Sequence, residues 1–145
     1  MLKGIDPILT PDLLRALASM GHGDSLAIVD ANYPAASIGP PVLHLAGVDT
    51  VQAANAVLSL IPLDQYAPEA AWCMDSGLST ELPIMQQLRS TIQKHEGDKF
   101  ELAKLERFSF YQQTKTAFVI ISTSERRLYG NLILKKGVIE ADSHQ

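Results

Sequence analysis

Short apolar runs alternate in this chain with segments whose apolar residues recur at helical spacing, and this alternation constrains the fold most. Strands are expected at residues 25–29, 42–45, 70–74, 100–105, 117–121 and 132–134. Helices are expected from Pro11 to a stop at Gly21, from Asp49 to before Pro62, at 82–95 with a stop at Gly97, and at 108–115, with an ordered loop over 31–41. Strands that alternate with helices predict an α/β fold, with a mainly parallel sheet and flanking helices.

The composition narrows the class of protein. The chain has 145 residues, 46% of them hydrophobic, which suits one domain over 1–145 with a sizeable core. A formal charge of −4 and the absence of a basic stripe argue against a nucleic-acid partner. Apolar runs of bilayer-spanning length or signal-peptide type are missing, and the lone cysteine, Cys73, suits a reducing compartment. We therefore expect a cytoplasmic protein without a membrane partner.

His22 is the most reactive-looking single residue. It stands between Gly21 and Gly23, which leave the imidazole sterically open, and an imidazole gives and takes protons near neutral pH. The competing interpretation is a histidine whose charge complements the C-terminal end of a helix. Local sequence alone favours that second interpretation.

Asp30 and Arg107 are candidate ligand contacts. Asp30 follows an apolar strand, and ligands of α/β proteins gather where parallel strands end. It could equally be a turn or helix-capping residue. The fork of donors on Arg107 suits hydroxyl recognition, although an exposed pair with Glu106 is the commoner fate of a lone arginine.

A polar triplet, Tyr129-Gly130-Asn131, opens the last apolar run. Tyr129 and Asn131 offer a phenol and an amide, and Gly130 would let a ligand or another chain approach closely. An ordinary turn at the entry to a strand is the alternative.

Other chemistries find no support in the residues. Nothing beside Cys73 suggests an activated thiol, and His44, His95 and His144 are scattered without the spacing of metal ligands. Neither common type of glycine-rich phosphate loop is present. No metal or cofactor is expected.

Several ordered blocks together resemble the sugar mutarotase family that contains L-fucose mutarotase and D-ribose pyranase. The blocks are Leu2-Lys3-Gly4-Ile5, Pro11-Asp12-Leu13-Leu14, Met20-Gly21-His22-Gly23-Asp24, Asp30-Ala31-Asn32-Tyr33-Pro34-Ala35, Arg107-Phe108-Ser109-Phe110-Tyr111 and the tail from Tyr129 to Val138. The middle of the chain, from Ala46 to Leu105, matches only loosely. The segment Asn32 to Ala35 and the arginine at 107 resemble the fucose branch more than the ribose branch.

The resemblance implies an isomerase that needs no cofactor. Its acid/base would be His22, with Tyr129 as a second proton carrier, and its sugar contacts would be Asp30, Arg107 and the segment Tyr129-Gly130-Asn131. The expected reaction is anomer exchange of a monosaccharide, most readily L-fucose, through opening and closing of the ring. A D-ribose pyranase, a non-catalytic sugar-binding protein and a purely structural assembly protein are the alternatives.

The tail also bears on assembly. Leu132 to Val138 suggests a short apolar strand at a sheet edge, which would invite pairing or covering. The resemblance implies homo-oligomers as large as decameric rings, with sites near subunit contacts. Tyr129 and Asn131 would then complete a neighbour's site.

Overall fold

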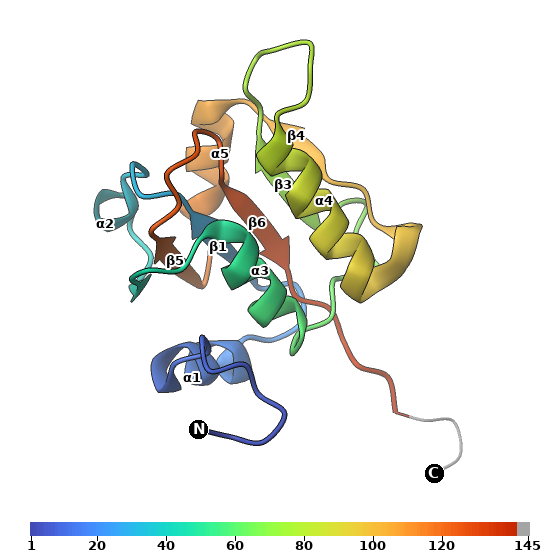
Figure 1. Cartoon of the computed structure of the whole chain (residues 1–145). Coiled ribbons are helices and arrows are strands. Elements are labelled where there is room, and N and C mark those ends of the chain that lie inside the picture. The colour runs from blue at the N-terminus through green and yellow to red at the C-terminus, as the bar shows by residue number, and fades with distance from the viewer. Residues whose placement is uncertain (142–145) are drawn as a thin grey trace.

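A computed structural model describes residues 1–141 of the chain as a single α/β domain (Figure 1). The last four residues of the expected domain, among them His144, lie outside the described residues. The helices are α1 (Pro11–Ser19), α2 (Ala35–Ile38), α3 (Thr50–Leu58), α4 (Pro83–Glu96) and α5 (Arg107–Thr114), with a 3-10 turn at Gly97–Lys99. The strands are β1 (Ser25–Val29), β2 (Val42–Leu45), β3 (Ala71–Met74), β4 (Ala103–Leu105), β5 (Val119–Thr123) and β6 (Leu132–Lys135).

All strands join one sheet in the order β2-β5-β1-β6-β3-β4. The pairs β1–β5, β2–β5 and β3–β4 are parallel, whereas β6 is antiparallel to both β1 and β3. Five of the six strands therefore point the same way. This confirms the predicted α/β fold with a mainly parallel sheet.

The position of β6 corrects the expectation of an edge strand. β6 lies inside the sheet between β1 and β3, and the edges are β2 and β4. Leu132, Ile133 and Leu134 are fully buried, so side chains on both faces of β6 enter the core. A run that is apolar at every position suits an interior strand, because helices cover both faces there.

Local differences from the expected elements are small. The loop expected at 31–41 contains the single-turn helix α2, and the strand expected at 100–105 shortens to β4. β5 begins two residues later than expected and runs to Thr123. Its parallel pairing explains this shift, since Leu26 faces Val119 and Leu45 faces Thr123.

The core has one layer on each face of the sheet. Leu26, Ile28 and Leu134 point towards the face covered by α1, α3 and α4. Helices α3 and α4 lie side by side on this face (Figure 1). Ala27 and Ile133 point to the opposite face, where Phe110 of α5 packs. Within residues 1–141, no helix is long and apolar enough to cross a membrane.

Caps on the helices follow from the sequence. Thr10 accepts a hydrogen bond from Leu13 N at the start of α1, and Pro11 occupies the first turn. Asp49 and Gln52 form a reciprocal capping box at the start of α3. These local bonds fix where α1 and α3 begin.

Candidate functional site

Asp30 and Asn131 meet at the end of β1, beside the beginning of β6. Asn131 Oδ1 accepts from Asp30 N at 2.8 Å, and Asn131 Nδ2 donates to Asp30 Oδ2 at 2.9 Å. Asn32 N donates to the other carboxylate oxygen of Asp30 at 2.9 Å. The Asp30 carboxylate is therefore held in one orientation, with both oxygens already engaged from the protein side.

A cavity of about 260 Å³ opens above this pair. Its walls are Asp30, Asn32, Tyr33, Met74, Arg107, Tyr111, Leu128, Tyr129 and Asn131. A wall that combines polar side chains with aromatic and apolar ones suits a ligand that carries both hydroxyls and a carbon skeleton. Of the predicted sugar contacts, Asp30, Arg107, Tyr129 and Asn131 all line this cavity.

Burial tunes two groups in the cavity wall. Burial raises the pKa of the Asp30 carboxyl, against the lowering effect of the hydrogen bonds from Asn32 and Asn131, and the charge of Glu125 adds to the rise. Burial also raises the pKa of Tyr33 to about 12. The Tyr33 hydroxyl donates to Thr114 Oγ1 at 2.9 Å, which makes this ring a fixed wall instead of a proton carrier.

Arg107 is the first residue of α5 and is exposed at the cavity mouth. Its guanidinium lies 4.6 Å from the centre of the Phe108 ring, a cation–π contact that leaves donors of the fork free to face a ligand. Arg107 and Tyr129 also line an adjoining hollow of about 310 Å³ with Asp75, Ser76 and Gly77. The site therefore continues beyond Asp30 along the surface.

Tyr129 has an unusual backbone conformation, and Gly130 beside it is buried. Among residues 1–141, Tyr129 is the one non-glycine residue with positive φ, at 64°. Such backbone is uncommon for a residue with a side chain and often marks functional sites. Gly130 is buried outside the cavity wall, and its carbonyl accepts from Thr50 Oγ1 at 2.7 Å.

His22 lies apart from this cavity and pairs with Asp64. Its Nε2 is 3.0 Å from Asp64 Oδ1, with the histidine side chain 46% exposed and the aspartate 6% exposed. Tyr66 packs edge-on against the imidazole at 5.8 Å between ring centres, and Tyr66 N donates to Asp64 Oδ1. A carboxylate at Nε2 selects the tautomer with hydrogen on that nitrogen, which leaves Nδ1 as the free acceptor.

Asp64 is a functional candidate that the sequence did not reveal. Burial raises the pKa of the Asp64 carboxyl, but the hydrogen bonds from His22 and from Tyr66 N outweigh it, so this pKa lies below its ordinary value. Asp64 is 42 residues from His22 in a loop without a motif, and the bridge Leu63–Lys136 brings it there. No local signal in the sequence could have paired the two.

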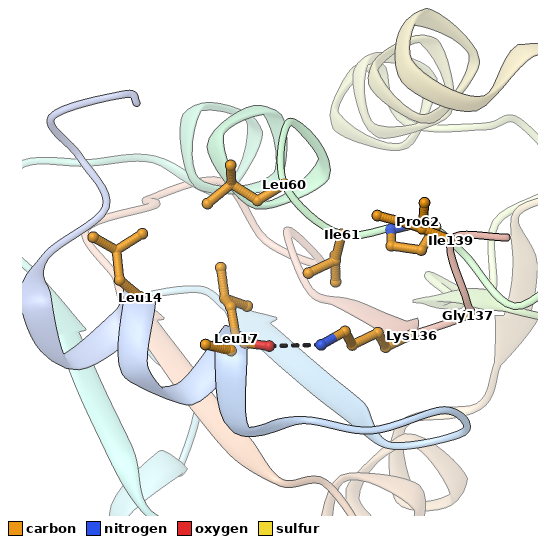
Figure 2. A pocket seen from close by; sticks show the side chains of 9 residues that line it. Leu14, Leu17, Leu60, Ile61, Pro62, Lys136, Gly137 and Ile139 are labelled. Atoms are coloured by element: carbon orange, nitrogen blue, oxygen red, sulfur yellow. Dashed lines mark hydrogen bonds between the residues drawn. The ribbon is translucent and has the colours of Figure 1, made fainter. Parts of the chain in front are cut away.

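Lys136 fixes the segment that carries His22. Its Nζ donates to the carbonyl of Leu17 at 2.7 Å, at the C-terminal end of α1 (Figure 2). It also donates to the carbonyl of Met20 at 2.6 Å. The backbone of Lys136 pairs with Gly23 N and with Asp24 O. The tail after β6 therefore holds both ends of the glycine-flanked turn.

The hollow drawn in Figure 2, about 480 Å³ in volume, is a poor sugar site. Its walls are mostly aliphatic, from Leu14, Leu17, Leu60, Ile61 and Ile139. Lys136 is the charged residue among its described walls, and helix carbonyls already engage its ammonium group. This hollow therefore lacks the convergent polar groups that orient a sugar.

The two candidate clusters, His22 with Asp64 and Asp30 with Asn131, lie at opposite ends of the same two strands. Ser25 and Lys135 pair at the end near His22, and Ile28 and Leu132 pair at the end near Asp30. A strand rises about 3.3 Å per residue, so roughly 20 Å separate the backbone at residues 24 and 30. Within one chain, the structure brings the expected sugar contacts together but keeps His22 away from them.

Within residues 1–141, no group of three or more His, Cys, Asp or Glu side chains is placed to hold a metal ion. Cys73 is a free, buried thiol, and burial raises its pKa to about 11. Such a thiol is poorly suited to nucleophilic chemistry at neutral pH.

Comparison with known proteins identifies the family. The model of the RbsD / FucU transport protein family matches residues 3–139. The chain belongs to this family. The fucose mutarotase of Mus musculus is 45% identical over 96% of this chain and 95% of its own length. These matches confirm the family resemblance seen in the sequence.

Solved structures of relatives share the fold. The fucose mutarotase from Streptococcus pneumoniae, solved in complex with L-fucose, has a TM-score of 0.89 at 38% identity, covering 96% of this chain and 100% of that one. The RbsD of Bacillus subtilis, solved with D-ribose, has a TM-score of 0.77 at 24% identity, covering 97% of this chain and 100% of that one. This RbsD / FucU family member is thus homologous to fucose mutarotases, which are isomerases.

Proposed function

We propose that this protein interconverts the anomers of L-fucose by acid/base-assisted opening and closing of the sugar ring. The observation that carries this proposal is the cavity in which Asp30, Asn131 and Arg107 converge with an apolar wall, in a chain homologous to fucose mutarotases. Carboxylate, amide and guanidinium groups together can both accept from and donate to the sugar hydroxyls. Met74 and Leu128 offer apolar surface for the 6-deoxy methyl group of fucose.

The reaction requires two proton transfers and no electron transfer. A proton leaves the anomeric hydroxyl and another reaches the ring oxygen, so the bond between C1 and the ring oxygen breaks and an open-chain aldehyde forms. Rotation about the bond between C1 and C2, followed by closure, gives the other anomer. General acid–base assistance of this kind contributes ~10²–10⁴-fold to a rate.

His22 is the proposed principal proton carrier. Its pairing with Asp64 orients the ring and presents Nδ1 to a substrate, and Asp64 would stabilise the imidazolium that forms when Nδ1 takes a proton. Tyr129 is the proposed second proton carrier, because its phenol lines the cavity beside Asp30. Arg107 and Asn131 would hold the hydroxyls that do not react.

A complete site is proposed to form between two copies of the chain. The end of β1 that carries His22 and the end that carries Asp30 are too far apart to serve one monosaccharide. A second copy that brings its exposed His22 to the mouth of the Asp30 cavity would complete the site. We therefore propose a homo-oligomer, in assemblies up to the decamer that the family resemblance implies.

The proposed partner is a monosaccharide, and the proposed compartment is the cytoplasm. A single cysteine, free and buried, supports a reducing compartment. The greater likeness to fucose mutarotases than to the ribose-bound relative supports L-fucose over D-ribose.

NMR saturation transfer between the two anomeric protons tests the activity directly. The protein should accelerate exchange of L-fucose above the buffer rate, in buffer without added metal, and should act less on D-ribose. His44→Ala, which changes an exposed histidine on the edge strand β2, is the matched control and should keep full activity. Exchange at the buffer rate for both sugars would refute the enzyme and leave a binding protein.

A further inference from the structure

The loop between β5 and β6 places Tyr129 and Asn131 in the cavity, and its conformation is unusual. Tyr129 has a φ of 64°, in the left-handed region that favours glycine. A residue with a large side chain keeps this conformation only where its surroundings over-determine it. Some contact outside the cavity must therefore hold the loop.

Glu125 supplies that contact from beneath the loop. Its side chain is 3% exposed, and its carboxylate accepts from three nitrogens of Arg127: the backbone N and Nε at 2.9 Å on Oε1, and Nη2 at 2.9 Å on Oε2. The two side-chain bonds form a bidentate ion pair, which fixes geometry as well as charge. Thr50 N points to Oε2 from the start of α3 at 3.4 Å.

Gly130 shows how closely Glu125 supports the loop. A Cβ at Gly130 would lie 2.7 Å from Glu125 Cγ and 3.2 Å from the carbonyl oxygen of Arg127. The glycine thus makes room for the buried carboxylate, and its own carbonyl is bonded to Thr50. The expected close approach at Gly130 is made by Glu125 of the same chain.

The same residue is tied to the other side of the site. Glu125 O accepts from Ala31 N at 2.9 Å, directly after Asp30. Thr123 Oγ1 donates to Val29 O and accepts from Glu125 N, which joins the ends of β1 and β5. Glu125 therefore connects the Asp30 segment with the Tyr129–Asn131 segment, although it does not line the cavity itself.

We propose that Glu125, through its ion pair with Arg127, is a positioning residue for sugar turnover. It holds Tyr129 in its left-handed conformation in the cavity wall and keeps the Asn131 amide bonded to the Asp30 carboxylate. This inference rests on the proposed function only for its activity readout. The geometric part, that the ion pair orders residues 126–131, stands without it.

The test compares Glu125→Gln with wild type and with Glu101→Gln, a matched change at an exposed glutamate. Glutamine keeps the shape of the side chain but lacks the negative charge that pairs with Nε and Nη2 of Arg127. We expect kcat for L-fucose exchange to fall by ~10²-fold, the size of effect that a misplacement of about 1 Å produces. KM should change much less, because Asp30 and Arg107 remain.

Hydrogen–deuterium exchange with mass spectrometry supplies a readout independent of sugar. Peptides that cover residues 126–131 should exchange faster in Glu125→Gln, while those that cover α4 and β1 should not change. If wild type shows no sugar exchange, the proposed function fails and this measurement alone decides the positioning role. Unaltered protection of residues 126–131 in a folded variant would overturn the proposal.

Arg127→Lys covers the case in which Glu125→Gln does not fold. The Arg127 side chain is 40% exposed, so its replacement leaves the core intact, and lysine keeps the charge but not the bidentate fork. We expect a smaller loss of kcat, ~10-fold, with faster exchange in the same peptides. Wild-type kcat in either folded variant would show that the ion pair merely stabilises the protein, and would reject the proposal.

Discussion

Asn131 and Asp30 hold each other through two hydrogen bonds across 101 residues of sequence. The amide oxygen of Asn131 accepts a hydrogen bond from the backbone N–H of Asp30, and the Asn131 NH₂ group donates one to the Asp30 carboxylate. One side chain thereby closes the gap between the end of β1 and the start of β6 and also orients the acid of the proposed sugar site. The fold and the proposed substrate binding therefore both depend on this amide.

Asn131→Ala should therefore weaken both folding and sugar binding. The buried N–H of Asp30 loses its acceptor, and an unsatisfied buried group costs about 1–3 kcal/mol of unfolding free energy. Urea denaturation at fixed protein concentration measures this loss. Asn32→Ala, at an exposed neighbour in the same cavity wall, should stay within ~0.5 kcal/mol of wild type. Equal stability of the two variants would show that the pair contributes little.

A residue without a titrating group at position 22 should not support the wild-type rate of L-fucose exchange. His22→Ala should lower the L-fucose exchange rate by at least ~10²-fold with the fold intact. His22→Gln should be nearly as slow, since an amide can form hydrogen bonds but cannot carry a proton. A glutamine variant with most of the wild-type rate at neutral pH would make His22 a binding residue.

Asp64→Asn should also lower the L-fucose exchange rate, by at least ~10-fold, because part of the acid–base assistance is lost. The asparagine NH₂ group can donate to Nε2 of His22, which would move the ring hydrogen to Nδ1 and remove the free acceptor. NMR saturation transfer measures the rate, and circular dichroism checks the fold. An unchanged rate would indicate that the pairing with Asp64 only anchors the loop.

Mixing two inactive variants should restore activity if each site draws on two chains. In a randomly exchanged equal mixture of His22→Ala and Asp30→Ala, about a quarter of the sites would join two intact halves. Light scattering should show the particle well above the 15.8 kDa of one chain. A mixture of His22→Ala with Asp64→Ala, which damages the same half of the site in both chains, is the control and should show no gain over the mean rate of its two components. Failure of both mixtures, with exchange of subunits verified, would contradict the shared site.

Glu125 should contribute to the loss of stability of the protein at acidic pH. The Arg127 guanidinium, with the backbone N–H of Arg127, holds the pKa of this carboxyl below its ordinary value of 4.5. A depressed pKa in the folded state stabilises the protein above about pH 4.5, and this contribution is lost as the pH falls through the lower folded-state value. The unfolding free energy of Glu125→Gln should therefore depend less steeply on pH than that of wild type in the window between this lower folded-state pKa and about pH 4.5. Parallel curves would mean that Glu125 contributes nothing to acid sensitivity.

The sequence by itself determined the element types and most of the chemistry of the Asp30 cavity. Helix caps at Thr10 and Asp49 and apolar runs at 25–29 and 132–134 act through neighbours a few residues away, so local pattern predicts them. Residues at the ends of strands gather at one edge of a mostly parallel sheet. For this reason the sequence identified residues such as Asp30 and Asn131, which the structure brings together.

Only the tertiary structure decided where β6 lies, which residue pairs with His22, and how far His22 is from the cavity. The apolar run from Leu132 to Leu134 suits an interior strand, but it does not reveal that β1 and β3 flank this strand or that it runs antiparallel to both. Asp64 and Glu125 gain their roles from partners distant in sequence or from burial beneath a loop. Strand order and burial depend on contacts between distant segments, and these exist only once the whole sheet has formed.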